Sequence, residues 1–314
     1  MLLVLRQFEA FVSRWRLARR APDTRARVVI HGGEPLLRPD LFQLLDRLAT
    51  KRDTFEYAVI SDGRCIDERI AARLARAGVS FVQVGLDGTR ATHDRLHGEG
   101  AFDGCVAALR HLQANAVPTV VAFGADTTNY HELGAVVRIA RGLRATRVWV
   151  DLGARVFRDD GTHVESVLSA DQNRELSAAI AAEQDSSRNV ERIEVVAHRC
   201  LHFLDDHFLI DSCGAGDTRI AVAANGDLLP CDRLVTPIGN VLDRSIAELY
   251  DHSHILQTLR DATRVADGCE GCADEPACRG GLKCISYAVT GNPFAADPCC
   301  WLAIPLPDLA EEAL

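Results

Sequence analysis

Clustered cysteines dominate the last third of this 314-residue chain and limit what it can fold into. A Cys-X2-Cys step on a turn lets two thiolates reach one metal, and neighbouring glycines let the backbone wrap closely around a bulky centre. Upstream, Cys213 and Cys231 flank an Asn225-Gly226 pair, which predicts a β-hairpin with a tight turn. Six of the 11 cysteines lie within 32 residues: Cys269, Cys272, Cys278, Cys284, Cys299 and Cys300. The spacing therefore predicts a metal-binding domain.

Eight soft thiolate ligands would satisfy two four-ligand iron–sulfur clusters, which we favour over zinc and over disulfide staples. The apolar start is too short for a secretory signal, and no stretch approaches the roughly 20 apolar residues that span a bilayer. We therefore expect a cytoplasmic protein with no membrane partner, in a compartment where clustered thiols favour metal over disulfides. A net charge of −9, with no basic tract rich in aromatics beyond the first helix, argues against a nucleic-acid partner.

The first 190 residues alternate between apolar strands and amphipathic helices. After a helix over residues 2–20, we predict strands at 27–30, 55–61, 79–85, 118–123 and 147–151, with helices after them at 40–48, 66–77, 102–113, 130–143 and 170–183. Five βα units at this spacing predict an α/β fold with a parallel sheet. Glycine turns follow the first three strands, and the carboxyl ends of parallel strands meet at one mouth where ligands bind. The two cysteines within these units, Cys65 and Cys105, are interpreted as buried apolar thiols.

The cysteine pattern resembles the SPASM domain, the auxiliary-cluster domain of many radical S-adenosylmethionine (SAM) enzymes. That family has Cys-X9–15-Gly-X4-Cys, then Cys-X2-Cys-X5-Cys-X3-Cys and a last cysteine; here five residues separate Cys278 from Cys284 instead of three. The resemblance implies two auxiliary 4Fe-4S clusters. It assigns the first to Cys213, Cys231 and Cys284, with Cys200 as a candidate fourth ligand. The second it assigns to Cys269, Cys272, Cys278 and Cys300, because Asp297-Pro298 resembles the usual approach to the closing ligand.

The strand ends resemble the radical SAM core. His31-Gly32-Gly33-Glu34-Pro35 looks like its Gly-Gly-Glu-Pro motif, and Ser61-Asp62-Gly63 lies where Thr-Asn-Gly is usual. Gly85-Leu86-Asp87-Gly88 replaces Ser-Leu-Asp-Gly, and residues 93–98 resemble His-Asp-Arg-Leu-Arg-Gly. Asp62 puts an anion where the family has an amide, which would repel the cosubstrate carboxylate at close range. The cofactor-binding residues that the resemblance implies are Gly32, Gly33, Glu34, Pro35, Ser61, Asp62, Gly85, Asp87, Asn129 and Arg155.

The family cleaves SAM on a cluster held by Cys-X3-Cys-X2-Cys after the first strand of its barrel, and these 314 residues contain no such motif. We therefore expect a partial (β/α)6 TIM-like barrel missing its first strand, over residues 1–190, followed by a SPASM domain with a β-hairpin over residues 191–314. Two explanations remain open: the true start lies upstream, or the radical step has been lost. The polypeptide itself is expected not to cleave SAM.

Three functions follow from these patterns. The first is a radical SAM/SPASM protein related to maturases of ribosomally made peptides, N-terminally truncated and acting on a peptide substrate. The second is a non-catalytic, cluster-bearing partner that binds a complete maturase or an electron-donor protein. The third is a zinc-binding structural module. In the family, the auxiliary clusters help hold the peptide and accept or pass the electron left by its oxidation.

Overall fold

The computed structural model describes residues 1–20, 23–152, 166–187, 193–198 and 212–303. The chain divides into two compact units. The first comprises residues 1–125, 129–151 and 179–197, and the second comprises residues 126–128, 152–178 and 198–314. The domain boundary expected between residues 190 and 191 stays a prediction.

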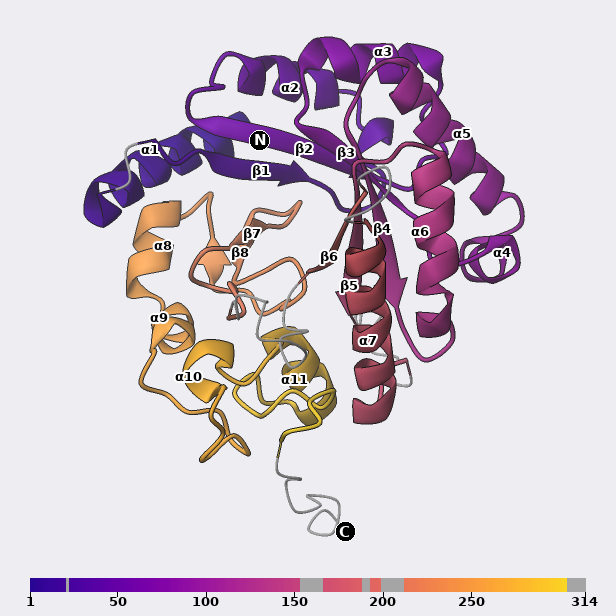
Figure 1. Ribbon diagram of the computed structural model, residues 1–314. Helices are drawn as coiled ribbons and strands as arrows, with labels where there is room; N and C mark the ends of the chain where they lie inside the picture. The colour runs from indigo at the N-terminus through magenta and orange to yellow at the C-terminus, as the bar shows by residue number, and fades with distance from the viewer. Residues whose placement is uncertain (21–22, 153–165, 188–192, 199–211, 304–314) are drawn as a thin grey trace. The chain divides into compact units, whose positions relative to one another are not determined.

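The first unit is built on one six-stranded sheet whose strands follow sequence order, from β1 at one edge to β6 at the other (Figure 1). β1 to β4 pair in parallel, with Ile30 opposite Val59 and Val59 opposite Val82. Strands in this register end near the same edge, so the loops after them gather there. The strands are β1 (Ala26–Ile30), β2 (Phe55–Ser61), β3 (Phe81–Gly85), β4 (Thr119–Ala125), β5 (Arg147–Leu152) and β6 (Glu194–His198).

Five strands were predicted from the sequence, and β6 was not among them. This strand has an apolar run of only three residues, Val195 to Ala197, between a glutamate and a histidine. Hydrophobic periodicity cannot identify a strand from so short a run. The sixth strand is supplied by hydrogen bonding along the edge of β5, which is a tertiary effect and not a local one.

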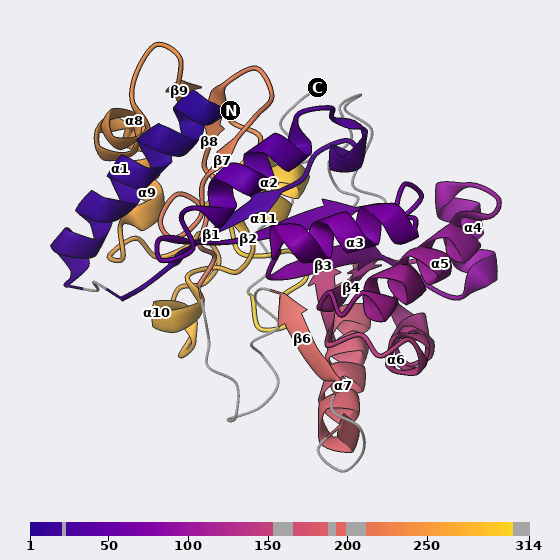
Figure 2. The ribbon, with the colours of Figure 1, turned by 90° about the horizontal axis from the view of Figure 1, so that it is seen from above.

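Helices pack along one face of this sheet, as Figures 1 and 2 show for α2, α3, α5 and α6. Their ends follow local rules: the Asp67 carboxylate accepts from the amide of Ile70 at the start of α3, and Gly78 ends it at φ +68°. Tyr57 is 1% exposed, and its hydroxyl donates to the Ala77 carbonyl, which ties α3 to β2. The helices are α1 (Leu2–Arg19), α2 (Leu41–Ala49), α3 (Glu68–Ala77), α4 (Arg90–His97), α5 (Ala101–Ala114), α6 (Leu133–Gly142) and α7 (Ala170–Ser187), with 3-10 turns at Pro35–Leu37 and Tyr130–Glu132.

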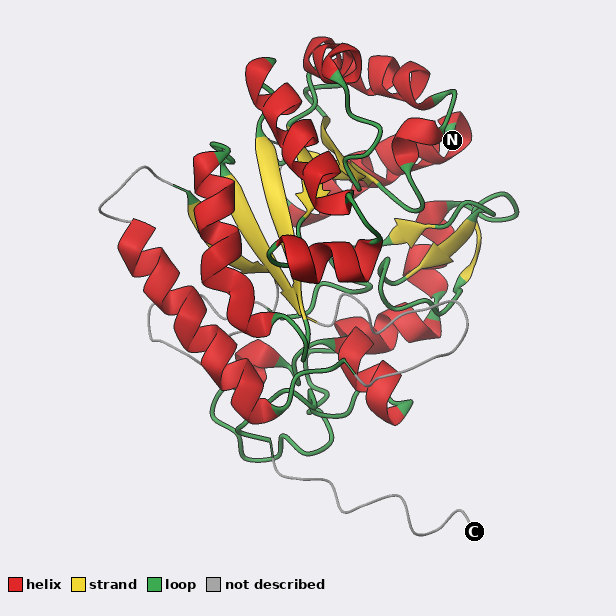
Figure 3. Ribbon diagram, turned by 90° about the vertical axis from the view of Figure 1, so that its right-hand side faces the viewer, coloured by secondary structure: helices red, strands yellow, loops and turns green. Residues whose placement is uncertain are grey.

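The second unit contains the cysteine-rich segment, a small antiparallel sheet and short helices (Figure 3). The predicted hairpin is confirmed: β7 (Ala221–Val222) pairs with β8 (Asp227–Leu229), and Gly226 in the turn has φ +92°. β9 (Gly239–Asn240) adds a third strand. The helices are α8 (Ile246–His252), α9 (His254–Arg260), α10 (Glu275–Cys278) and α11 (Lys283–Thr290). In the described part of the chain, no helix combines the length and the apolar character needed to cross a membrane.

Candidate functional site

Four cysteines of the second unit line one pocket: Cys269, Cys272, Cys278 and Cys300. The amide of Cys272 donates to the carbonyl of Cys269 at 3.1 Å, so the Cys-X2-Cys step is a tight turn. Cys278 ends the short helix α10, and two glycines with φ near +80° redirect the chain behind it. Three separate stretches therefore bring their thiols to one place. This set matches the second of the two expected ligand groups, whose role stays a prediction.

Asp297 links the segment that carries Cys300 to the backbone at Leu282. Asp297 is only 4% exposed, and its carboxylate accepts hydrogen bonds from the amides of Leu282 and Cys299, each at 2.9 Å. Its carbonyl accepts from the amide of Cys300 at 2.9 Å. A Cβ on Gly281 would lie 2.4 Å from the Cβ of Asp297, so the two backbones approach each other closely. Burial raises the pKa of this carboxyl, and the two amide hydrogen bonds offset part of that increase.

The spacing of the sulfurs bears on which metal they suit. A tetrahedral zinc site with Zn–S bonds of about 2.3 Å would hold its sulfurs roughly 3.8 Å apart. Among the described residues, no three cysteine sulfurs lie within 4.8 Å of one another, and no disulfide joins any of them. The ligands of a multi-iron cluster surround a larger body than those of a single zinc ion, so their sulfurs lie farther apart.

Burial shifts the pKa of two pocket thiols, Cys269 and Cys278, well above the usual range. Burial, followed by the neighbouring thiols Cys300 and Cys272, raises the pKa of Cys269 to about 11. Burial likewise raises the pKa of Cys278 to about 12, although a hydrogen bond from the Gly281 amide opposes the increase. A bound cation would have to compensate the charge of deprotonation, which is what iron in a cluster does.

The first expected ligand group is only partly described. Cys231 is fully buried, with its sulfur 3.1 Å from a carboxylate oxygen of Asp232, and Cys284 lies buried in the first turn of α11. Cys213 is half-buried, and Cys200 lies outside the described residues. The described sulfurs do not form a close trio, so this ligand set stays a prediction.

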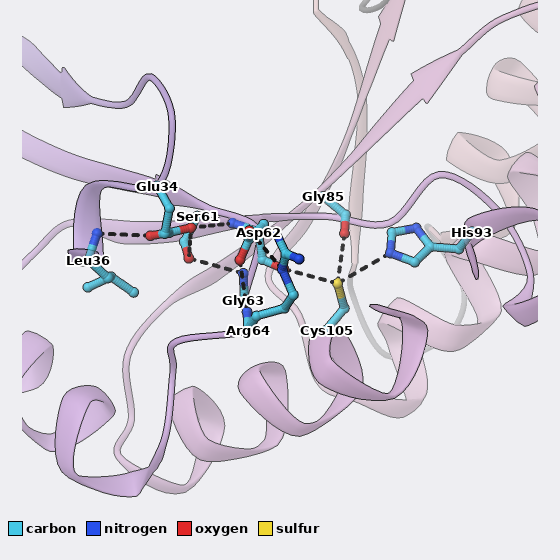
Figure 4. Close-up of polar contacts among 9 residues, drawn as sticks. All are labelled: Glu34, Leu36, Ser61, Asp62, Gly63, Arg64, Gly85, His93 and Cys105. Carbon is cyan, nitrogen blue, oxygen red and sulfur yellow. Dashed lines mark hydrogen bonds and ion pairs between the residues drawn. The ribbon is translucent and has the colours of Figure 1, made fainter. Parts of the chain in front are cut away.

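The carboxyl ends of the parallel strands of the first unit meet at one edge of the sheet, which we call the mouth. Glu34 links the ends of β1 and β2 there (Figure 4). One carboxylate oxygen accepts from the Leu36 amide, and the other accepts from the Ser61 hydroxyl and the Asp62 amide, all at 2.9 Å. Ser61 in turn accepts from the amide of Gly63 at 3.0 Å. The turn before Glu34 needs glycine, because residues 32 and 33 have φ of +94° and +44°.

Asp62, the anion that stands where the family has an amide, is paired with Arg64. Arg64 donates to its carboxylate through Nε at 3.0 Å and a terminal nitrogen at 2.6 Å, and the Arg64 amide donates to the other oxygen (Figure 4). Burial alone would raise the pKa of Asp62, but these hydrogen bonds outweigh it and hold the pKa below its usual value. The pair is close to neutral, which removes the reason to expect repulsion of a carboxylate. Arg64 was not among the site residues predicted from the sequence.

Two further expected residues, Asp87 and Asn129, support the mouth from β3 and β4. The Gly124 amide donates to the Asp87 carboxylate at 2.7 Å. Asn129 is fully buried, and its side chain donates to the carbonyls of Asp87 and Gly124 at 3.0 and 2.9 Å. Glu132 accepts hydrogen bonds from the Thr89 amide and the Thr92 hydroxyl. Arg155 lies outside the described residues.

Cys105 does more than fill the core. Its sulfur lies 3.3 Å from the carbonyl oxygens of Asp62 and Gly85 and 3.5 Å from His93 Nε2, and burial raises the pKa of its thiol to about 12 (Figure 4). Cys65, expected to be buried, is half-exposed. A cavity of about 270 Å³ opens at this mouth, and the side chains of His31, Asp62, Arg64, His93, His97 and Cys105 contribute to its lining. A cavity this size, with few polar groups converging on it, suits a small-molecule ligand.

Comparisons with known proteins agree with this picture. The model of the Radical SAM superfamily matches residues 9–140, and that of the SPASM iron–sulfur cluster-binding domain matches residues 213–273. The chain is 28% identical over 292 residues to a PqqA peptide cyclase of Gluconobacter oxydans, covering 90% of this chain and 78% of the relative. It is 29% identical over 305 residues to the mycofactocin maturase MftC of Mycolicibacterium smegmatis, covering 91% and 73%. An AdoMet-dependent heme synthase of Methanosarcina barkeri is 24% identical over 294 residues, covering 87% and 81%.

Among solved structures, Streptococcus suis SuiB bound to S-adenosylmethionine superposes with a TM-score of 0.71 at 18% identity, covering 93% of this chain and 70% of SuiB. SuiB bound to its precursor peptide SuiA gives a TM-score of 0.66 at 16% identity, covering 92% and 69%. At these identities the likeness concerns the fold, and the six-stranded α/β core is that of radical SAM enzymes. The chain is therefore a radical SAM/SPASM protein, related to the PqqA peptide cyclases and the mycofactocin maturases.

Proposed function

We propose that this chain binds a 4Fe-4S cluster on Cys269, Cys272, Cys278 and Cys300 and serves in the modification of a peptide. The observation that carries the proposal is the convergence of four thiols, from three stretches of chain, on one pocket. We further propose a second auxiliary cluster on Cys213, Cys231 and Cys284 with Cys200. We also propose a reducing, cytoplasmic setting, in which cysteines stay reduced and available as ligands. When bound, such a cluster supplies one-electron transfer.

The chain's own residues have distinct tasks in this proposal. Asp297 holds the loop that carries Cys300 against the backbone at Leu282, so the fourth ligand keeps its position. At the other site, the mouth cavity of the first unit takes S-adenosylmethionine. The Gly32-Gly33 turn exposes backbone there, and Glu34 fixes that turn against Ser61 at the end of β2. The ion pair with Arg64 neutralises the Asp62 carboxylate at the mouth.

A peptide substrate is proposed from the relatives. Two of them are named for a peptide cyclase and a maturase, and SuiB has been solved with a precursor peptide. The relative named as a heme synthase would point to a different substrate, but its sequence identity to this chain is lower than that of the other two relatives. A partner that donates electrons, or a complete maturase, belongs to the same proposal and rests on the cluster's redox chemistry alone.

The cluster that cleaves S-adenosylmethionine in this family does not fit these 314 residues, because they contain no Cys-X3-Cys-X2-Cys. The polypeptide, reconstituted anaerobically with iron and sulfide and given a strong reductant, is expected to release no 5′-deoxyadenosine from S-adenosylmethionine. Chromatography of the quenched mixture measures this, with a complete family member as the positive control. Release at a rate comparable with the control would contradict the assignment of the remaining cysteines to auxiliary clusters.

The ligand assignment is tested by comparing Cys300→Ser with Cys299→Ser. The two cysteines are adjacent, but Cys300 lines the pocket, whereas Cys299 is buried outside its lining at 2% exposure. After anaerobic reconstitution we expect Cys300→Ser to lose most of the iron of one cluster, about half of the roughly eight irons that two clusters hold. Cys299→Ser should keep its iron.

Iron analysis and the visible absorption of the cluster report the result of this comparison. Equal iron in the two serine variants would refute the choice of Cys300. Stoichiometric zinc, with no visible absorption after reconstitution of the unaltered chain, would refute the cluster itself and favour a structural zinc module. Circular dichroism of each variant shows whether a loss of iron follows from unfolding.

A further inference from the structure

A second group of metal-binding side chains lies at the mouth of the first unit, far along the sequence from the cysteine-rich segment. One carboxylate oxygen of Asp87 and one ring nitrogen each of His93 and His97 all lie within 4.8 Å of one another. Asp87 follows β3, while both histidines lie on α4, four residues apart and so on one face of that helix. The three residues contain no sulfur, so their chemistry differs from that of the cysteine pocket.

The third member of this group departs from the family pattern that its segment resembles. The segment His93-Asp94-Arg95-Leu96-His97-Gly98 resembles a family pattern that ends in Arg-Gly, so His97 stands where arginine is usual. An arginine there would form an ion pair with Asp87 and would never ligate a cation, because its guanidinium stays protonated. Histidine can offer a nitrogen lone pair at the same place, and His97 Nε2 lies 2.7 Å from Asp87 Oδ2.

We propose that Asp87, His93 and His97 bind a divalent transition-metal ion at the mouth cavity. Two imidazoles and one carboxylate are the donor set of Zn²⁺ and non-haem Fe²⁺ sites, in which the remaining positions stay open to water or substrate. His93 and His97 both line the cavity, so those open positions would face it. The ion would replace the direct contact between His97 Nε2 and Asp87 Oδ2, and any proton held in that contact would pass to solvent.

His93 already has the tautomer that such a ligand needs. Its Nδ1 accepts a hydrogen bond from the Asp87 amide at 3.0 Å, so the ring proton is on Nε2, which lies 3.5 Å from the sulfur of Cys105. An ion bound at Nδ1 would replace the amide as partner of that lone pair, while Nε2 kept its proton toward Cys105. The other Asp87 oxygen stays oriented by the Gly124 amide. Metal-ligating histidines and carboxylates are commonly held by outer contacts of this kind.

The test is a calorimetric titration with Zn²⁺, run anaerobically on the full chain after its iron–sulfur clusters have been reconstituted. The chain is compared with His97→Arg, which restores the residue usual in the family, and with His252→Arg, an exposed histidine at the end of α8 that serves as control. Any binding of Zn²⁺ to cysteines is the same in the three proteins, so a difference in Zn²⁺ stoichiometry between them reports on the site at the mouth. We expect the unaltered chain and His252→Arg to bind one equivalent more than His97→Arg.

Two further variants keep the proposal open to refutation. Asp87→Asn removes a ligand charge and should also lose that equivalent, whereas Cys105→Ser keeps the ligands and should weaken binding by only about tenfold. Thermal unfolding without metal checks that each variant is folded; if His97→Arg proves unfolded, His97→Gln takes its place. Equal Zn²⁺ stoichiometry and affinity in the unaltered chain, the position-97 variant and Asp87→Asn would overturn the site and leave a plain His97–Asp87 ion pair. This outcome is independent of the cysteine pocket, which can hold its cluster in either case.

Discussion

Asp297→Ala is expected to abolish iron binding at the pocket of Cys269, Cys272, Cys278 and Cys300. The substitution leaves two buried amide groups, those of Leu282 and Cys299, without the acceptor that each now has at 2.9 Å. Each unsatisfied buried donor costs about 1–3 kcal/mol. The loss also separates the loop before Cys300 from the turn at Gly281, so the fourth thiol would no longer be held over the other three. Iron content after anaerobic reconstitution measures the effect.

Two companion variants show whether the effect comes from the hydrogen bonds. Asp297→Asn keeps the shape and one acceptor oxygen, so part of the iron should be retained. Asp243→Ala removes an exposed carboxylate of the same unit, between β9 and α8, and should behave as the unaltered chain does. If Asp297→Ala loaded iron fully, the loop before Cys300 would be held by something other than this carboxylate, and its positioning role would be wrong.

The sequence was sufficient for the order of β1 to β5 and for one helix after each of them, though not for α4, because each βα unit carries its own signals. An apolar run such as that of β2, an N-cap such as Asp67 and a stop such as Gly78 are local features that need no knowledge of the partner strand. β6 was missed because its few apolar residues become a strand only next to β5. The grouping of Cys300 with the Cys-X2-Cys pair came from family resemblance, since 27 intervening residues give no geometric constraint by themselves.

The polar contacts of the mouth could be predicted only in part. The parallel register brings the ends of β1 and β2 level, so a contact between Glu34 and residues after β2 follows from topology. The closure of Arg64 onto Asp62 depends on the local turn, and an arginine two positions away could equally have pointed to solvent. Cys105 was taken for a core thiol because a single cysteine in an apolar helix carries no signal that its sulfur meets two strand-end carbonyls.

Glu34→Ala is the second change with a large expected effect, on the affinity of the mouth for S-adenosylmethionine. The Glu34 carboxylate is the shared acceptor for the Leu36 amide, the Ser61 hydroxyl and the Asp62 amide. Hydrogen bonds to a charged group contribute about 1.5–3 kcal/mol each, so their loss would free the Gly32-Gly33 turn from the end of β2. We expect the affinity to fall by at least about tenfold. Binding would then have to order the freed turn, and a free-energy cost of about 1.4 kcal/mol is enough to weaken binding tenfold.

Equilibrium dialysis with labelled S-adenosylmethionine measures this affinity in Glu34→Ala, Glu34→Gln and the control Glu99→Ala, which removes an exposed carboxylate between α4 and α5. The glutamine variant keeps one acceptor oxygen and should lie between the alanine variant and the unaltered chain. Urea unfolding of the same samples separates a loosened turn from a failed fold, since only the latter moves the midpoint of the whole first unit. Unchanged affinity in Glu34→Ala, with an intact fold, would mean that the cosubstrate does not use the turn after β1 and that the mouth binds something else.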